Sequence, residues 1–333
     1  MKLHPAELRK TSEAALIRAG VSPNNAKIQV DLLLDAELRG HVSHGLMRLP
    51  RLIQRIQNGV ASADATGCSS WSGGALLSVD GQNGLGPVVA MAALDQLCDR
   101  VERTGVAIAA IRDCNHLGML AWYARAIALR GKVLLALTTS EALVHPWGGR
   151  CAMVGTNPIA IGVPAEPRPF VMDMATSLVS MGKVHDYANR GQDIPEGWAL
   201  DENGDPTTDA RAGARGAIAP FGGPKGYALG LGFEVLVAAL TGSALGSNVV
   251  GTLDDDKVCN KGDLFIVMQP DTAAFRPISA YLEAIRAMPS ADPARPVSVP
   301  GDRAERVHAA KSEEGHAPNP EIWQKICALA GEI

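Results

Sequence analysis

Hydrophobic side chains in residues 1–60 recur at intervals of three and four positions, the spacing of one face of a helix. Ser22 and Pro23 are typical of a helix start, because a serine side chain caps free amide groups and proline fits the first turn. That helix is expected to end near Gly40. Its apolar stripe consists of Ile28, Leu32, Leu33 and Ala36.

A further helix is expected to end near Gly59. Its apolar positions are Leu49, Leu52, Ile53 and Ile56. Residues Ser43, His44 and Gly45 therefore fall in the turn between two helices. In such a turn polar side chains can be presented rather than buried.

Beyond Gly73 the pattern changes to short apolar runs that alternate with helix-like stretches. The runs cover residues 75–79, 105–111, 133–138, 159–163, 170–172 and 264–268. The helix-like stretches cover residues 87–103, 120–129, 226–240 and the tail from 278, apart from Pro- and Ala-rich loops at 289–300. Residues 189–215, rich in Gly, Asp and Pro, are expected to form a long surface excursion. The alternation predicts an α/β layer fold.

Composition narrows the class of protein. The chain has 333 residues, 47% of them hydrophobic, a net charge of −4 and a mean hydropathy of +0.05. It is long enough for two domains. The charge offers no basic surface for nucleic acid, and no apolar run approaches the roughly 20 residues that span a bilayer. Residues 1–9 lack the hydrophobic core of a signal peptide, so secretion is not expected.

The cysteines are scattered and form no CxxC pair, which favours reduced thiols in the cytoplasm and disfavours a structural zinc site. They are Cys68, Cys98, Cys114, Cys151, Cys259 and Cys327. Cys114 lies close to a histidine and could act as a nucleophile, but a small buried residue is the preferred interpretation.

The residues with most chemical potential are Ser43, His44 and Arg48. Together they could move a proton, hold the proton donor in place and bind a carboxylate. His116 lies in a second polar segment, and Lys225 ends a glycine-rich turn. The set predicts an enzyme site for a small anionic substrate.

Dinucleotide-binding signals are weak. The Gly-x-Gly-x-x-Gly fingerprint that follows an early strand in many dehydrogenases is absent. Residues 81–86 have the wrong glycine spacing and are interpreted as a strand-to-helix turn. The turn that ends at Lys225 is the better phosphate candidate, because backbone amides and an ammonium group precede a helix there.

Several segments resemble the malate/L-lactate dehydrogenase type 2 family, which includes ureidoglycolate, sulfolactate and diketogulonate enzymes and related cyclic-imine reductases. Their order and spacing cover residues 40–300. The matching segments are Ser43-His44-Gly45 with Arg48, Asn115-His116-Leu117-Gly118, Gly155-Thr156-Asn157-Pro158, Asp173-Met174-Ala175-Thr176-Ser177, Gly182-Lys183-Val184, Pro195-Glu196-Gly197-Trp198, Pro206-Thr207-Thr208-Asp209 and Gly222-Gly223-Pro224-Lys225-Gly226.

The resemblance implies an oxidoreductase that uses NAD or NADP and needs no metal. It implies a nicotinamide-binding α/β domain that is not of the Rossmann type, at residues 73–289. A helical domain would combine residues 1–72 with residues 290–333. The family also implies a homodimer, with the active site in the cleft between the domains and near the dimer contact.

The resemblance assigns roles to individual residues. His44 is expected to transfer the proton with Ser43 behind it, Arg48 to clamp the substrate carboxylate, and Thr156 to contact substrate. His116 could replace His44 as the acid/base group. The expected cofactor contacts are His116, Leu117, Gly118, Met119, Leu120, Ser140, Met174, Ala175, Thr176, Gly182, Pro224, Lys225, Pro300, Gly301 and Arg303.

Two positions depart from the family pattern. Cyclic-imine reductases tend to have an aspartate where this chain has Lys183. A lysine cannot stabilise a histidinium in that way, although it could bind an anionic substrate or the cofactor. The departure favours a 2-hydroxy acid over the alternative, a piperideine- or pyrroline-2-carboxylate. At position 52 this chain has Leu52 where several family members have a tyrosine, and the identity of the substrate stays open. The choice between NAD and NADP is open as well.

Two other classes of protein could use the same residues. His44, His116 and Asp173 could make a metal-dependent hydrolase, but no HxH or HExxH spacing supports that. Asp173 is instead expected to be structural. A binding protein without activity is also conceivable, although all the expected polar site residues are present.

Overall fold

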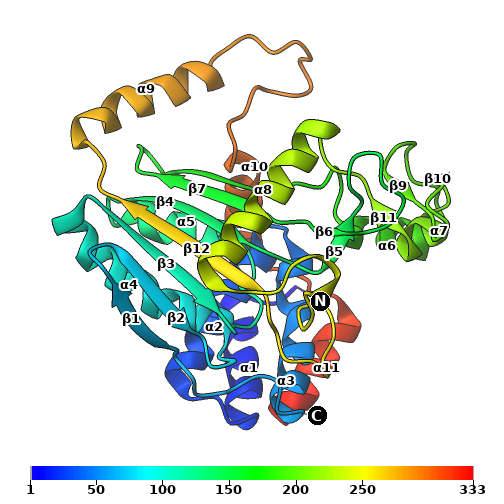
Figure 1. Cartoon of the computed structure of the whole chain (residues 1–333), viewed down its shortest axis with the longest axis horizontal. Helices are drawn as coiled ribbons and strands as arrows, with labels where there is room; N and C mark the ends of the chain where they lie inside the picture. The colour runs from blue at the N-terminus through cyan, green and yellow to red at the C-terminus, as the bar shows by residue number, and fades with distance from the viewer. Residues whose placement is uncertain (1, 333) are drawn as a thin grey trace.

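The computed structural model describes residues 2–332. Its centre is a seven-stranded sheet in the order β1-β2-β3-β12-β4-β7-β8 (Figure 1). Only β2 and β3 run parallel; the other neighbours are antiparallel. The strands are β1 Cys68–Ser72, β2 Leu76–Asp80, β3 Val106–Arg112, β4 Val133–Thr138, β7 Ile159–Val163, β8 Phe170–Met174 and β12 Gly262–Met268.

Helices cover both faces of this sheet. Helices α4 (Gly86–Thr104) and α5 (Leu120–Leu129) pack on one face, and α8 (Pro224–Thr241) packs on the other. Alternate residues of β3 show why, since successive side chains of a strand point to opposite faces. Ala109 belongs to the core shared with α4 and α5, whereas Ala110 belongs to the core shared with α8.

The N-terminal helices and the C-terminal tail pack together. Helix α1 (Pro5–Arg18) contacts both α2 (Pro23–Leu38) and α11 (Pro320–Ala330), α11 contacts α3 (Leu49–Gln57), and α10 (Asp302–Glu314) contacts α2. The predicted start of α2 is confirmed, because the Ser22 side chain accepts a hydrogen bond from the Asn25 amide. The proposed division into domains stays a prediction. Strand β1, just before its boundary at residue 73, belongs to the large sheet.

A smaller sheet lies beside the large one in the order β10-β9-β11-β5-β6. Its elements are β5 Ala142–Val144, β6 Val154–Gly155, α6 Met181–Asn189, β9 Ala199–Leu200, β10 Pro206–Thr207, α7 Ala210–Arg215 and β11 Ala217–Ile218. The expected surface excursion at 189–215 is therefore wrong in part. Ile194, Ala199 and Ala210 are buried in a core of this sheet. Strands of two residues are too short to show alternation, and the Gly and Asp residues between them concealed this core.

The remaining elements are peripheral. Helix α9 (Phe275–Arg286) extends from the body (Figure 1). Four 3₁₀ turns complete the described elements: η1 Val42–His44, η2 Leu46–Arg48, η3 Gly246–Asn248 and η4 Thr272–Ala274. Within residues 2–332, every helix is too short or too polar to traverse a bilayer.

Candidate active site

The turn between α2 and α3 presents the expected catalytic side chains. Ser43 Oγ lies 3.0 Å from Nδ1 of His44, at the end of η1. Arg48, the residue before α3, donates from Nε to the Ser43 carbonyl oxygen at 2.8 Å. That bond leaves the outer nitrogens of the guanidinium free to meet a ligand. The three residues therefore form one group, as the sequence predicted.

A buried carboxylate holds this turn. The Leu46 amide donates to Glu37 Oε2 at 3.0 Å, and His316 Nε2 lies 2.8 Å from Glu37 Oε1. Gly45 is required here, because a Cβ at that position would overlap the Glu37 carboxylate. Since His316 belongs to the C-terminal segment, both ends of the chain meet behind the turn.

His116 faces His44 from the loop before α5, with ring centroids 5.5 Å apart. The Gly118 amide donates to His116 Nδ1 at 3.0 Å. A neutral His116 therefore carries its proton on Nε2. The loop is tied down by Asn115, whose side chain donates to the carbonyl oxygens of Asn83 and Gly84.

The predicted strand-to-helix turn at residues 81–86 is confirmed, since β2 ends at Asp80 and α4 begins at Gly86. Gly86 allows the loop that carries His116 to approach, because a Cβ there would overlap the His116 backbone. The glycine-rich segment thus supports the site mechanically.

The environment disfavours positive charge on the histidines. Burial, followed by the charges of Arg48 and His41, lowers the pKa of His44 to about 3. Burial and then Arg48 also lower the pKa of His116. The pKa of Arg48 falls to about 10, chiefly through burial and the neighbouring Arg51. At neutral pH the protein therefore has two neutral imidazoles beside a guanidinium.

A cavity of about 40 Å³ opens beside these residues. Such a volume admits a few water molecules or the polar end of a small ligand. Arg48 and His116 line it, together with Gln29, Leu33, Arg51, Leu52, Arg55, Asn115, Gly118, Gly251 and Thr252. Positive and amide groups dominate its polar lining, which suits an anion.

A second cluster of predicted residues forms around Thr156. The Thr156 amide donates to Ser140 Oγ at 2.9 Å, and the two hydroxyl oxygens lie 3.1 Å apart. Thr176 donates from both its amide and its hydroxyl to the Thr156 carbonyl oxygen. Met174 ends β8, and Ala175 joins it to Thr176. The structure thus brings Ser140, Thr156 and residues 174–176 together.

The glycine-rich turn lies next to this cluster. The Phe221 amide donates to the Thr176 carbonyl oxygen at 3.1 Å. Gly222 and Gly223 adopt positive φ, and α8 begins at Pro224. Lys225 is exposed in the first turn of this helix. The start of α8 therefore offers backbone amides with an exposed lysine beside them, and its role as a phosphate site stays a prediction.

Other predicted residues stand apart. Lys183 lies in α6, where its ammonium sits 5.1 Å from the centre of the Trp198 ring. Its neighbour Gly182 is exposed on the same helix. Within residues 2–332 Lys183 makes no hydrogen bond or ion pair with the His44 group. The substrate and cofactor roles of these two residues stay predictions.

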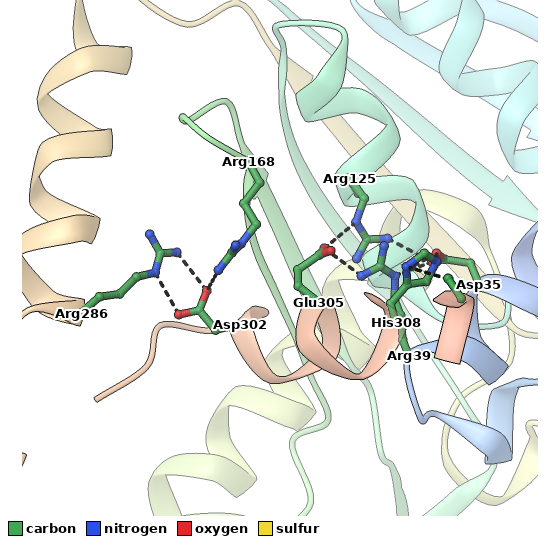
Figure 2. A network of polar contacts seen from close by, with 9 residues as sticks. Asp35, Arg39, Arg125, Arg168, Arg286, Asp302, Glu305 and His308 are labelled. Atoms are coloured by element: carbon green, nitrogen blue, oxygen red, sulfur yellow. Dashed lines mark hydrogen bonds and ion pairs between the residues drawn. The ribbon is translucent and has the colours of Figure 1, made fainter. Parts of the chain in front are cut away.

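The segment Pro300-Gly301 leads into α10, and Arg303 is exposed in its first turn. Asp302 anchors this start, receiving hydrogen bonds from Arg168 at 2.6 Å and from Arg286 (Figure 2). Further along α10, Glu305 pairs with Arg39 and Arg125 (Figure 2).

Asp173 behaves as a structural residue. Its carboxylate accepts a hydrogen bond from the Ala121 amide at the start of α5 at 2.7 Å. Cys114 is fully buried, in agreement with the preferred interpretation. Among residues 2–332 no cluster of three or more His, Cys, Asp or Glu side chains has a geometry that could hold a metal ion.

Sequence reasoning missed part of the cavity wall. Arg51 was overlooked, although it lies one helical turn after Arg48 and that spacing could have revealed it. Thr252 was overlooked because it comes from a distant loop. Its amide and hydroxyl both donate to Glu141 Oε1, at 2.8 and 3.0 Å. No local pattern marks such a pair.

Comparison with known proteins gives consistent matches. A family described as malate/L-lactate dehydrogenase matches residues 3–327. The chain is 34% identical over 339 residues to a malate/(S)-sulfolactate dehydrogenase of Methanothermus fervidus, covering 100% of this chain and 98% of that protein. It is 33% identical over 314 residues to a (2R)-3-sulfolactate dehydrogenase (NADP(+)) of Chromohalobacter salexigens, covering 93% and 92%.

A Delta(1)-pyrroline-2-carboxylate/Delta(1)-piperideine-2-carboxylate reductase of Pseudomonas aeruginosa is 38% identical over 237 residues, covering 71% of each chain. The crystal structure of a dehydrogenase from Sinorhizobium meliloti superposes with a TM-score of 0.94 at 50% identity, covering 99% of this chain and 98% of that one. On its sequence over nearly the full length and on its α/β fold, the chain belongs to the malate/L-lactate dehydrogenase family.

Proposed function

We propose that the protein is an NAD(P)-dependent dehydrogenase of a small 2-hydroxy acid resembling malate, lactate, sulfolactate or ureidoglycolate. The substrate gives a hydride from C2 to the oxidised cofactor and a proton from its hydroxyl group, leaving a 2-oxo acid and the reduced cofactor. The observation that carries the proposal is that Ser43, His44, Arg48 and His116 lie together, and that Arg48 and His116 of this group line one small cationic cavity.

His44 is the proton-transfer residue in this proposal. Its Nδ1 faces a hydroxyl group, which can either donate or accept a hydrogen bond. Nε2 of His44 can therefore be the base in oxidation and the acid in reduction. His116 is less adaptable, because the Gly118 amide can only donate to its Nδ1. We assign His116 the role of a neutral hydrogen-bond donor to the substrate oxygen.

Arg48 is the carboxylate clamp. Its Nε is held by the Ser43 carbonyl, so the two remaining nitrogens can form the paired hydrogen bonds that a carboxylate accepts. Clamping the carboxylate fixes C2 relative to His44. Thr156 is proposed as a further substrate contact. Its neighbour Asn157 is fully buried and anchors this part of the chain.

The nicotinamide cofactor would supply the hydride acceptor. The donor groups present fit a dinucleotide, because the start of α8 offers free amides and Lys225 for its phosphates. The clustered Ser140, Thr156 and Thr176 offer hydroxyl groups beside that helix. The remaining proposed contacts are His116, Leu117, Gly118, Met119, Leu120, Met174, Ala175, Gly182, Pro224, Pro300, Gly301 and Arg303.

We propose that this cofactor domain, residues 73–289, is not of the Rossmann type. The mainly antiparallel order of its sheet supports this, since a Rossmann sheet is mostly parallel. The helical domain would comprise residues 1–72 and 290–333. NAD and NADP both remain candidates; Arg303 and Lys183 are the cations available for a 2′-phosphate.

We also propose that two copies pair through α8. Gly226, Gly230 and Val237 of this helix are buried, whereas its opposite side exposes apolar residues. Those residues are Leu229, Leu231, Val235, Leu236 and Leu240. An apolar face of this kind is typical of an interface rather than of a solvated helix.

The dispersed free cysteines support a location in the cytoplasm.

Reduction of a cyclic imino acid is the second candidate function, favoured by the similarity to the Pseudomonas aeruginosa reductase. Lys183 argues against it. Its ammonium lies 5.1 Å from the centre of the Trp198 ring, and a lysine cannot orient or stabilise a histidinium as an aspartate would.

The test is titration with NADH and NADPH, followed by an absorbance assay of cofactor oxidation with 2-oxo acids and cyclic imines. Turnover of a 2-oxo acid would support the proposal and identify the cofactor. Turnover of imines alone would favour the reductase. Absence of binding for both nucleotides would remove the dehydrogenase assignment.

A further inference from the structure

Helix α3 places a row of arginines along the cavity. Arg48, Arg51 and Arg55 are three and four residues apart, so they follow one stripe of the helix. All three line the cavity beside His116. Arg55 is buried and Arg48 partly buried, whereas Arg51 is exposed at the mouth of the cavity, where its guanidinium can meet a ligand.

Hydrogen bonding separates the roles of these arginines. Arg55 is buried and hydrogen-bonded within the protein: its Nε donates to Asn115 at 3.0 Å, and another nitrogen donates to the Asp254 carbonyl oxygen at 2.7 Å. In Arg48 only Nε makes a hydrogen bond. Arg51 has no hydrogen-bond or ion-pair partner among residues 2–332. Its charge is nevertheless close enough to lower the pKa of Arg48.

No acidic residue among those described neutralises Arg51. Glu141 influences Arg48 electrostatically. However, Oε1 of Glu141 accepts from the Thr252 amide, the Thr252 hydroxyl and the Leu253 amide, at 2.8 to 3.0 Å. The Glu141 carboxylate is thus held by the loop that closes the cavity. Two guanidinium groups remain available at one opening.

We propose that Arg51 binds a second anionic group of the substrate, so that the enzyme prefers dianionic 2-oxo and 2-hydroxy acids. This rests on the proposed function, in which Arg48 binds the carboxylate next to C2. Residues three apart on a helix have Cβ atoms about 5–6 Å apart. Arg51 can therefore reach a carboxylate or sulfonate on the far end of a short substrate.

Leu52 agrees with this assignment. It lines the same cavity without offering a polar group. Leu52 therefore offers no hydrogen bond to the far end of a substrate, and Arg51 is the neighbouring cation that can bind a charge there.

The test compares oxaloacetate, a dianion, with pyruvate, a monoanion, in the wild type and in Arg51→Gln. We expect kcat/KM for oxaloacetate to fall about 10- to 100-fold, as for the loss of one charge-assisted hydrogen bond. Most of the change should lie in KM. Pyruvate turnover should change by less than about twofold, and Arg51→Lys should recover part of the loss with oxaloacetate.

Arg103→Gln is the matched control, because Arg103 is exposed at the end of α4 and far in sequence from the cavity. It removes the same charge and should leave both substrates unaffected. Added salt should raise KM for oxaloacetate more in the wild type than in Arg51→Gln.

The outcomes separate the two proposals. If the wild type reduces no 2-oxo acid, the proposed function falls and this inference falls with it. The wild type could reduce both acids while Arg51→Gln impairs the reduction of the two acids equally, or impairs the reduction of neither. Either result overturns this inference and leaves the proposed function standing. A wild type that prefers pyruvate overturns it as well.

Discussion

At the scale of single residues, the proposed chemistry depends on the protonation of His44. Its pKa near 3 follows from burial, with Arg48 and His41 adding repulsion. Because this pKa lies below the usual range of histidine, the imidazole is neutral at pH 7 and can accept a proton from a hydroxyl group. A carboxylate bound at Arg48 would offset part of the repulsion and raise the pKa in the complex.

We therefore predict that kcat/KM for hydroxy-acid oxidation stays level as pH falls through about 6.5, the pKa of a free histidine, and drops only at lower pH. Reduction needs the protonated ring, so its kcat should decline as pH rises. The measurement is a pair of pH–rate profiles. An oxidation profile that falls near pH 6.5 would contradict the assignment.

His44→Gln supplies the companion test, with turnover expected to fall about 10²- to 10⁴-fold and cofactor affinity little changed. His185→Gln is the control, because His185 is exposed on α6. It should leave the rate and both profiles as in the wild type.

The sequence predicted some of these residues and not others for a geometrical reason. Ser43, His44 and Arg48 lie within six positions, so one turn brings them together whatever the rest of the fold does. Arg51 follows Arg48 by one helical turn, so helical spacing could have indicated it. Thr252 reaches the same cavity from a distant loop, and its position depends on tertiary packing, which local patterns do not encode.

At the scale of elements, the turn between α2 and α3 depends on the Glu37 carboxylate. It accepts from the Leu46 amide and pairs with His316 of the C-terminal segment. Glu37→Ala should cost about 1–3 kcal/mol of unfolding free energy, because it leaves a buried amide without an acceptor.

The same substitution should lower kcat by loosening the support of His44, while Glu37→Gln, which keeps one acceptor, should lower it less. Chemical denaturation and steady-state kinetics measure the two effects. Glu313→Gln, at an exposed position of α10, is the control. Full stability in Glu37→Ala would show that the carboxylate does not hold the turn.

Element prediction succeeded where periodicity was long. Residues 120–129 and 133–138 match α5 and β4 at both ends, since each carries a continuous apolar pattern. It failed in the smaller sheet, whose β9, β10 and β11 have two residues each. Such strands are specified by their partners across the sheet rather than by their own pattern, and the pairing of β11 with β5 joins residues more than 70 positions apart.

At the scale of the whole molecule, Asp302 joins three separate segments (Figure 2). Burial raises its pKa, but hydrogen bonds from Arg286 and Arg168 outweigh that effect and hold the pKa below the usual range. Its carboxylate thus fixes the start of α10 against α9 and the loop before β8.

Asp302→Asn should cost about 2 kcal/mol of unfolding free energy, because it weakens charge-assisted hydrogen bonds. It should also weaken cofactor binding if Gly301 and Arg303, which flank the residue, make the cofactor contacts proposed above. Thermal unfolding and nucleotide titration measure the two effects. Asp292→Asn, at an exposed loop position, is the control, and equal stability of the two variants would count against the anchor.

The exposed face of α8 leads to the last prediction, that the protein is a dimer at micromolar concentration. Two-fold symmetry would place this face against itself, burying side chains that a monomer leaves in water. Leu236, 44% exposed in the single chain, lies within the face. Leu236→Glu would bring like charges together across the axis and should shift the protein to monomer. Leu129→Glu is the control, because Leu129 is 69% exposed at the end of α5, outside the face. Sedimentation velocity distinguishes the cases. A monomeric wild type would mean that something other than a second copy covers α8, whereas a dimer that survives Leu236→Glu would move the interface to another surface.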